Sequence, residues 1–202
     1  MVLEEIYRFE NGMVKKDGEL CWEFDRLFQE IKNGLKKCKE IGKIPVSMGV
    51  DTWGVDFVLM DKDDKVLGNT VGYRDHRNEG MDEEVYKTIS LEDLYARTGI
   101  QKAIFNTVYQ LMAVKTKHPE YLEQAETMLH VPDYFHYLLT GKKTCEYTEA
   151  TTGQLVNAET KDWDYELIDK LGYPRKMFQK LIMPGTSVGH FTEEVKAEVG
   201  FD

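Results

Sequence analysis

The chain has 202 residues, of which 42% are hydrophobic and 11% aromatic, enough to bury a core in one large domain or two unequal lobes. Its formal net charge of -10 argues against nucleic acid or an anionic membrane surface as the main partner, because long-range repulsion would oppose both. The longest apolar runs are far shorter than a bilayer span, and no basic start followed by an apolar stretch marks the N-terminus. We expect a soluble, unexported, cytoplasmic protein.

Three widely spaced cysteines, Cys21, Cys38 and Cys145, support the same compartment. An odd number at these spacings fits reduced thiols better than a disulfide framework or a zinc site. We interpret all three as packing residues.

Two alternating segments open the chain. Residues 3–9 and 19–24 alternate between apolar and polar side chains, and the pairs Asn11-Gly12 and Asp17-Gly18 between them are turn signals. The pattern predicts an antiparallel strand pair.

A helix, two strands and a polar turn are predicted next. Asp25 can cap a helix whose apolar residues recur on one face, and Gly42 suits its end. Two short apolar strands follow at 46–50 and 57–60, separated by the polar segment 51–56. The strands therefore flank a candidate site.

Helices dominate the rest of the pattern. Ser90 is a predicted cap, and Thr107 with Gln110 forms a predicted capping box. A strand at 128–131 leads into a helix that Gly141 ends, and short helices are predicted at 164–171 and 192–199.

Searches for common catalytic motifs return little. No G-x-G-x-x-G occurs, and the segment 141–144, Gly-Lys-Lys-Thr, lacks the upstream glycine of a phosphate-binding loop. The histidines have no metal-ligand spacing, and no serine lies in a nucleophile elbow. The residues alone indicate an α/β domain with a candidate small-molecule site at 51–56.

Five segments resemble one family, in order along the chain. Asp-Thr-Trp-Gly-Val-Asp-Phe-Val-Leu at 51–59 resembles the sugar-site strand of rhamnulokinases, members of the FGGY carbohydrate kinase family, which also includes glycerol kinases and xylulokinases. The other matching segments are Tyr-Arg-Asp-His-Arg at 73–77, residues 99–101 with 105–111, residues 132–135 with 139–141, and residues 146–148 with 150–157.

The resemblance implies a fold and an activity. It implies a ribonuclease H-like, actin-like ATPase domain, a mixed sheet with helices, in which residues 1–202 form the N-terminal sugar-binding domain. Such kinases transfer phosphate from ATP, with Mg²⁺, to L-rhamnulose, giving L-rhamnulose 1-phosphate. Alternatives are a kinase for fuculose, xylulose or glycerol, and a non-catalytic sugar-binding or regulatory remnant.

The resemblance also implies that parts of the enzyme lie elsewhere. The family's first strand, with its acidic Gly/Ser-rich phosphate motif, would precede residue 1, and its catalytic aspartate would follow Asp202. The domain that mainly holds ATP would be absent too. We therefore expect no catalytic residue in this chain and no activity of the fragment alone. We also expect the fragment to be less stable than the full domain and prone to aggregate at exposed strand edges.

Nine residues are predicted to contact sugar by matching the family motifs: Asp51, Thr52, Trp53, Gly54, Asp56, Arg74, Asp75, Phe105 and Asn106. Gly54 would let the ligand approach the backbone, Asp56 could accept bonds from hydroxyls, and Trp53 could cover an apolar face of the sugar.

Structural roles are alternatives for most of them. Gly54 could serve only the turn, and Trp53 could belong to the core. An Arg74–Asp75 ion pair could hold the loop, and Asn106 could cap a helix.

Overall fold

The computed structural model describes residues 2–202 as a mixed arrangement of helices and short strands. The first part of the chain contains β1 (Val14–Lys16), β2 (Glu19–Cys21), α1 (Phe24–Glu40), β3 (Phe57–Met60), the 3-10 turn η1 (His76–Asn78), α2 (Met81–Tyr86), α3 (Leu91–Thr98) and α4 (Thr107–Lys117). The second part contains α5 (Pro119–Gln124), β4 (Thr127–His130), α6 (Val131–Thr140), β5 (Cys145–Glu146), α7 (Tyr147–Thr151), β6 (Val156–Asn157), β7 (Asp162–Trp163), α8 (Tyr165–Lys170), η2 (Arg175–Met177), β8 (Leu181–Ile182) and α9 (Glu193–Val199).

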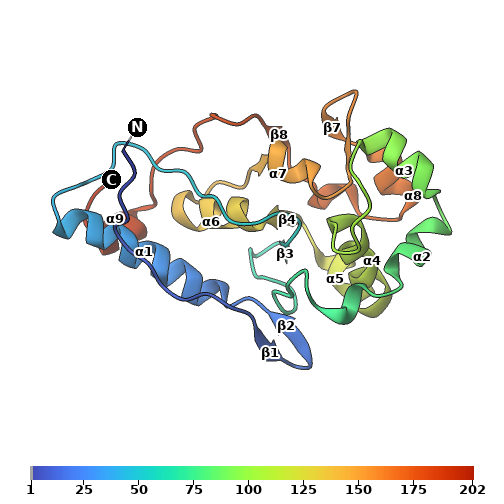
Figure 1. Cartoon of the computed structure of the whole chain (residues 1–202), viewed down its shortest axis with the longest axis horizontal. Coiled ribbons are helices and arrows are strands. Elements are labelled where there is room, and N and C mark those ends of the chain that lie inside the picture. The colour runs from blue at the N-terminus through green and yellow to red at the C-terminus, as the bar shows by residue number, and fades with distance from the viewer. Residues whose placement is uncertain (1) are drawn as a thin grey trace.

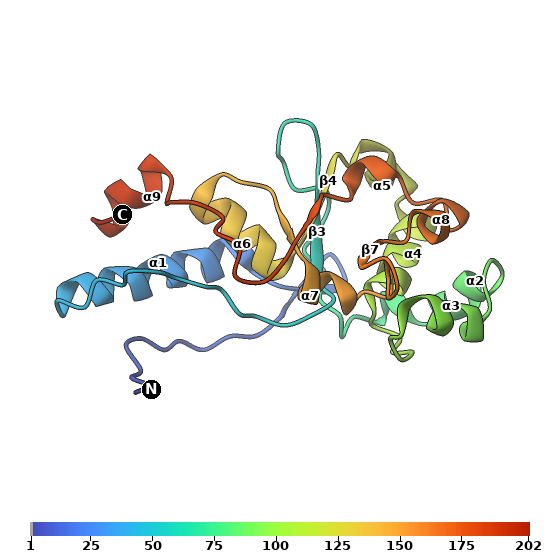
Figure 2. The same ribbon diagram turned by 90° about the horizontal axis from the view of Figure 1, so that it is seen from above.

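The antiparallel pair β3–β4 lies at the centre of the molecule. Phe57 lies opposite His130 and Met60 opposite Thr127, and every residue of both strands is buried. Helices α1, α6 and α9 lie on one side of the pair, and α2 to α5 and α8 lie on the other (Figures 1 and 2). Burial on both faces explains why the two strands are continuous apolar runs rather than alternating ones.

The remaining strands form three small ladders in the described chain. β1 pairs with β2 and β6 with β7 in antiparallel fashion, whereas β5 and β8 are parallel. The α/β class expected from the sequence is therefore confirmed, with strands in both orientations.

The helix α1 follows the predicted apolar face. Phe24, Leu27 and Leu35 are buried, and the helix is followed by Gly42, whose φ of 72° lies in the left-handed region that glycine adopts without strain. The predicted cap at Asp25 is wrong, because Glu23 occupies the N-cap position and Asp25 lies in the first turn. Leu35 packs with residues of α6 and α9 in a second, smaller core.

The predicted strands at 3–9 and 46–50 are wrong. Neither segment forms a strand ladder in the described chain, and Leu3 and Val46 are 85% and 104% exposed. Residues 2–13 run beside α1 instead, where the Tyr7 hydroxyl donates to Glu30 and the Arg26 guanidinium donates to the Glu10 carbonyl. An alternating pattern supplies a strand face, but the strand forms only where another backbone accepts its hydrogen bonds.

Most of the predicted helix ends are confirmed. The Ser90 hydroxyl accepts a hydrogen bond from the Asp93 amide at 3.0 Å, Thr192 caps α9 in the same way, and Gly141 ends α6 with a φ of 72°. The predicted capping box of Thr107 and Gln110 is wrong. Asn106 occupies the N-cap position, and the Gln110 amide reaches the 51–56 segment instead.

Three carboxylates, Asp133, Glu146 and Glu149, gather where α6 meets β5 and α7. Each has one buried oxygen without a hydrogen-bond partner among the described residues. Burial, followed by the negative charges of Asp133 and Glu146, raises the pKa of Glu149 to about 8. Burial likewise raises the pKa of Asp133 to about 7, although the Glu146 amide donates to it at 3.0 Å. Ionising this cluster opposes folding.

Truncation of the central strand pair should be costly. Leu129→Ala removes a fully buried side chain of β4 and should lower the free energy of unfolding by about 2–5 kcal/mol. Leu3→Ala, at an 85% exposed position, should change it by less than about 0.5 kcal/mol. Urea denaturation of both variants measures the difference, and equal losses would contradict the described core.

The carboxylate cluster should make stability fall as pH rises. The pKa of Asp133 is raised from 3.8 to about 7, and that of Glu149 from 4.5 to about 8. Between each ordinary pKa and its raised value, the folded chain holds more protons than the unfolded chain. The free energy of unfolding should therefore decrease from about pH 5.5 to pH 8.5. Since one pKa unit corresponds to about 1.4 kcal/mol, Glu149→Gln should reduce that decrease by about 1–3 kcal/mol.

Thermal melts at both pH values provide the measurement. Glu194→Gln, an exposed substitution in α9, should retain the wild-type pH dependence. A Glu149→Gln variant with the same pH slope as the wild type would show that the cluster is not responsible.

Candidate functional site

The polar segment 51–56 enters the core at Val55. This residue has a φ of 71°, an unusual conformation for a β-branched side chain. Its amide donates to the Thr152 hydroxyl at 3.2 Å, and its carbonyl accepts bonds from Thr107 at 2.8 Å and Gln110 at 3.2 Å. Side chains from α4 and from the end of α7 therefore determine the path of the segment.

Asp56 is the most heavily bonded residue of the segment. One carboxylate oxygen accepts from the indoles of Trp22 at 2.7 Å and Trp53 at 3.0 Å and from the Tyr73 amide at 3.1 Å. The other oxygen accepts from Gln110 at 3.0 Å. Burial raises the pKa of Asp56, and these hydrogen bonds oppose that effect. The side chain is 1% exposed, so in this arrangement it positions its neighbours.

A cavity of about 750 Å³ lies directly beside the segment. Four of the nine predicted sugar-contact residues line it: Trp53, Gly54, Phe105 and Asn106. The other lining residues are Val55, Tyr73, Tyr95, Gly99, Ile100, Gln101, Ala103 and Thr152. The structure thus brings together residues that precede α2 in the chain, Tyr95 of α3, residues of the loop after α3, and Thr152 at the end of α7.

Gly54 lies where a side chain would be crowded. A Cβ atom at this position would lie 3.2 Å from the Thr152 side chain. The absence of a side chain therefore keeps the backbone close to Thr152 and leaves the cavity open. The close contact seen here is with Thr152, and the approach of a sugar to Gly54 stays a prediction.

Aromatic rings form the walls of the cavity. Trp53 lies against Trp22 with ring centroids 4.2 Å apart, and Phe105 meets Tyr73 edge to face at 5.6 Å. Phe105 is 40% exposed. Rings whose faces or edges stay accessible, combined with backbone polar groups, are typical of sites for small polar ligands with an apolar face.

Asn106 orders the loop that forms one wall. Its amide nitrogen donates to the Gln101 carbonyl at 3.0 Å and to Gln154 at 2.8 Å. The expected capping role is wrong, because the side chain makes no cap bond to α4. Its bonds instead tie the loop of residues 101–106 to the end of α7.

The other five predicted contacts, among them the buried Asp56, lie outside the cavity lining. Asp51 is exposed, and the Thr52 hydroxyl bonds to the neighbouring Trp53 carbonyl. Arg74 donates to the Tyr73 hydroxyl at 2.9 Å rather than pairing with Asp75. Asp75 accepts from the amides of Leu20 at 2.7 Å and Arg77 at 2.7 Å, which joins β2 to η1.

Some lining residues were not predicted as contacts. Tyr73, Gln101 and Thr152 belong to the segments that resemble the kinase family, so the same motifs could have identified them. Tyr95 lies on α3 outside those segments, and only the tertiary structure places it at the cavity.

Within residues 2–202 no group of three or more His, Cys, Asp or Glu side chains is arranged to hold a metal ion. The described residues therefore offer magnesium no ready-made set of oxygen ligands. Of the helices in the same residues, none combines the length and apolarity needed to cross a membrane.

Curated relatives match nearly the whole chain. It is 55% identical over 200 residues to a rhamnulokinase of Halalkalibacterium halodurans and 48% identical over 200 residues to one of Oceanobacillus iheyensis. Each alignment covers 99% of this chain and 43% of the relative. The chain thus spans less than half the length of these relatives.

Solved structures share the fold. A xylulose kinase from Rhodospirillum rubrum superposes with a TM-score of 0.85 at 18% identity, covering 95% of this chain and 41% of that one. One from Lactobacillus acidophilus gives 0.80 at 21% identity, with coverages of 95% and 40%. The expected ribonuclease H-like, actin-like fold is confirmed. The family model for the N-terminal domain of FGGY carbohydrate kinases matches residues 5–202, and the chain belongs to that family.

Proposed function

We propose that residues 1–202 form the sugar-binding domain of an ATP-dependent kinase that phosphorylates L-rhamnulose at its 1-hydroxyl, in the breakdown of L-rhamnose. The observation that carries the proposal is the 55% identity to a curated rhamnulokinase over 99% of the chain. The cavity beside 51–56 supports it, because it combines aromatic walls with the Gly54 backbone, which no side chain covers.

The chain's own residues would bind and orient the sugar. Gly54 would admit the ligand to the backbone, and Trp53 and Phe105 would cover its apolar methyl-bearing face. Asp51, Thr52, Arg74 and Asp75 lie within two residues of lining residues in the sequence and would be the nearest further polar groups. Orientation of this kind is a main source of catalysis in phosphoryl transfer.

The remaining chemistry would come from other parts of the enzyme. ATP with Mg²⁺ would supply the phosphoryl group, and the general base and the nucleotide-binding segments would lie outside the 202 residues. Under this proposal the enzyme works in the cytoplasm, which fits the three free cysteines, Cys21, Cys38 and Cys145.

A substrate panel tests the proposal. The longer protein that contains these residues should phosphorylate L-rhamnulose with a higher kcat/KM than L-fuculose, D-xylulose or glycerol, as measured by coupled ADP release. Preference for another acceptor would overturn the substrate assignment. Sugar binding without turnover in that longer protein would favour a non-catalytic sugar-binding role.

The aromatic wall should contribute to sugar affinity. Phe105→Ala removes a ring that lines the cavity and should weaken L-rhamnulose binding by about tenfold, as expected for loss of about 1.4 kcal/mol of contact energy. Ile104→Ala, a neighbouring position that is 41% exposed and outside the lining, should leave the affinity unchanged.

Calorimetric titration of the 202-residue chain and its variants measures both effects. Because Phe105 is 40% exposed, its removal should alter the melting temperature little. Equal affinities of the two variants would place the sugar away from this wall.

A further inference from the structure

The side chain of Gln110 joins two walls of the sugar-site cavity. Its nitrogen donates to the Val55 carbonyl at 3.2 Å and to the Asp56 carboxylate at 3.0 Å, both in the 51–56 segment. The same nitrogen donates to the Phe105 carbonyl, on the loop after α3, at 2.9 Å. Val55 and Phe105 line the cavity, whereas Gln110 is fully buried behind them. We call these three bonds the Gln110 bridge.

One orientation of the Gln110 amide satisfies its surroundings. The nitrogen has two hydrogens for three acceptors, so all of its donor capacity is used. The side-chain oxygen faces Arg77, whose guanidinium donates to it at 3.1 Å and can never accept. Rotating the amide by half a turn would place oxygen against three acceptors and donor against donor, which is costly in a buried site. Arg77 therefore selects the orientation that forms the bridge.

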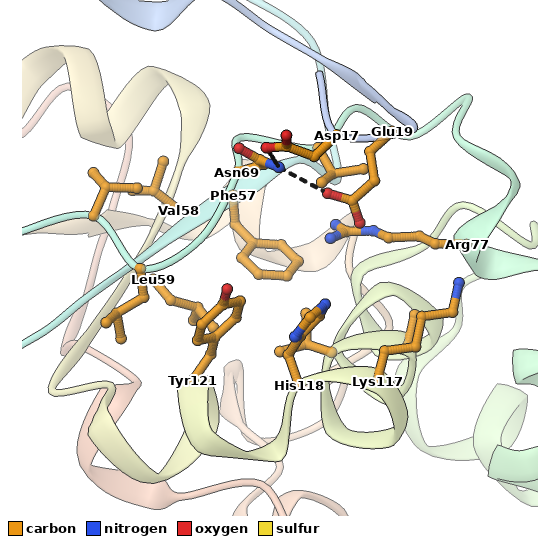
Figure 3. Close-up of a pocket in the computed structure, with 15 residues that line it drawn as sticks. Asp17, Glu19, Phe57, Val58, Leu59, Asn69, Arg77, Lys117, His118 and Tyr121 are labelled. Carbon is orange, nitrogen blue, oxygen red and sulfur yellow. Dashed lines mark hydrogen bonds between the residues drawn. The ribbon is translucent and has the colours of Figure 1, made fainter. Parts of the chain in front are cut away.

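Arg77 itself lies outside the sugar-site cavity. It lines a separate cavity of about 310 Å³, and Figure 3 shows its guanidinium beside the Glu19 carboxylate of β2. Its backbone amide donates to Asp75 at 2.7 Å. Burial lowers the pKa of the guanidinium, and the charges of Glu19, Asp56 and Asp75 oppose that effect. An arginine in such surroundings remains a cation and a donor.

We propose that Gln110 and Arg77 are positioning residues for sugar binding. The Gln110 bridge sets how far the 51–56 segment lies from Phe105, and Arg77 keeps the bridge formed. This inference rests on the proposed function, because the cavity between these walls must hold the sugar. Small displacements of binding groups are expensive, since a misplacement of about 1 Å can cost about a hundredfold in rate.

Sugar titrations of the full 202-residue chain test both residues. Gln110→Met has a similar volume but cannot donate, and it should weaken L-rhamnulose binding by about tenfold. Arg77→Met removes the orienting donor and should weaken binding by about fivefold. Arg175→Met, the same change at an exposed arginine paired with Asp169, should leave the affinity unchanged. Wild-type affinity in either site variant would overturn the role of that residue.

The double variant separates positioning from two independent structural effects. If Arg77 acts through Gln110, the double variant should bind L-rhamnulose about tenfold more weakly than the wild type, as Gln110→Met alone does. Independent effects would multiply to about fiftyfold and would contradict the proposal. Arg77→Lys keeps a group that only donates and should restore part of the affinity. If Arg77→Met does not fold, Arg77→Gln replaces it, because an amide can donate or accept and no longer selects one orientation.

Kinetics of the longer protein add a second readout. Arg77→Met should raise the KM for L-rhamnulose by about fivefold and change the KM for ATP by less than about twofold, since the nucleotide-binding segments lie elsewhere. A rise in both KM values together with a loss of kcat would indicate a general disturbance of the fold and would contradict a positioning role.

A measurement without sugar keeps this inference separate from the proposed function. The Gln110 side-chain hydrogens should exchange slowly with solvent, because the amide is buried and bonded. Their exchange should be at least about tenfold faster in Arg77→Met and unchanged in Arg175→Met. Unchanged exchange in Arg77→Met would overturn the orienting role of Arg77. If the wild-type chain does not bind L-rhamnulose, the proposed function fails, while the exchange rates still decide whether Arg77 maintains the bridge.

Discussion

The buried carboxylate of Asp56 is the point on which the candidate sugar site depends. Four donors from four separate parts of the chain converge on it: the indoles of Trp22 and Trp53, the Tyr73 backbone amide and the Gln110 side-chain amide. Each donor belongs to a different wall or support of the cavity. Removing the carboxylate would leave these donors unsatisfied inside the protein, which is costly. The position of the Trp53 ring and the path of residues 51–56 therefore follow from one interaction.

The same network explains how a short, irregular segment can be rigid. Residues 51–56 form no helix or strand ladder, yet Val55 and Asp56 are bonded by side chains from α4 and from the end of α7. Loops supported in this way can present binding groups with the precision of regular elements. Gln110 has a second role, since its side-chain oxygen also accepts a hydrogen bond from Arg77.

Polar residues that matched the family motifs differ in what the fold does with them. Asp75 and Asn106 both resemble ligand-contact positions, but their bonds hold neighbouring backbone: Asp75 accepts from Leu20 and Arg77, and Asn106 donates to Gln101. Gly54, Trp53 and Phe105 remain available at the cavity surface. The motif matches predict this region as the sugar site, and the hydrogen bonds of Asp75 and Asn106 show that these two side chains also support the backbone around it.

Several features followed from the sequence by itself, because they depend on local chemistry. Apolar runs predicted β3 and β4, and Ser90 and Gly141 marked helix ends through their own backbone preferences. The motif order indicated the kinase family. Only the tertiary structure decided that residues 3–9 and 46–50 have no ladder, that Gln110 serves Asp56 rather than a capping box, and that Tyr95 reaches the cavity. Those outcomes depend on partners distant in the chain, which no local pattern specifies.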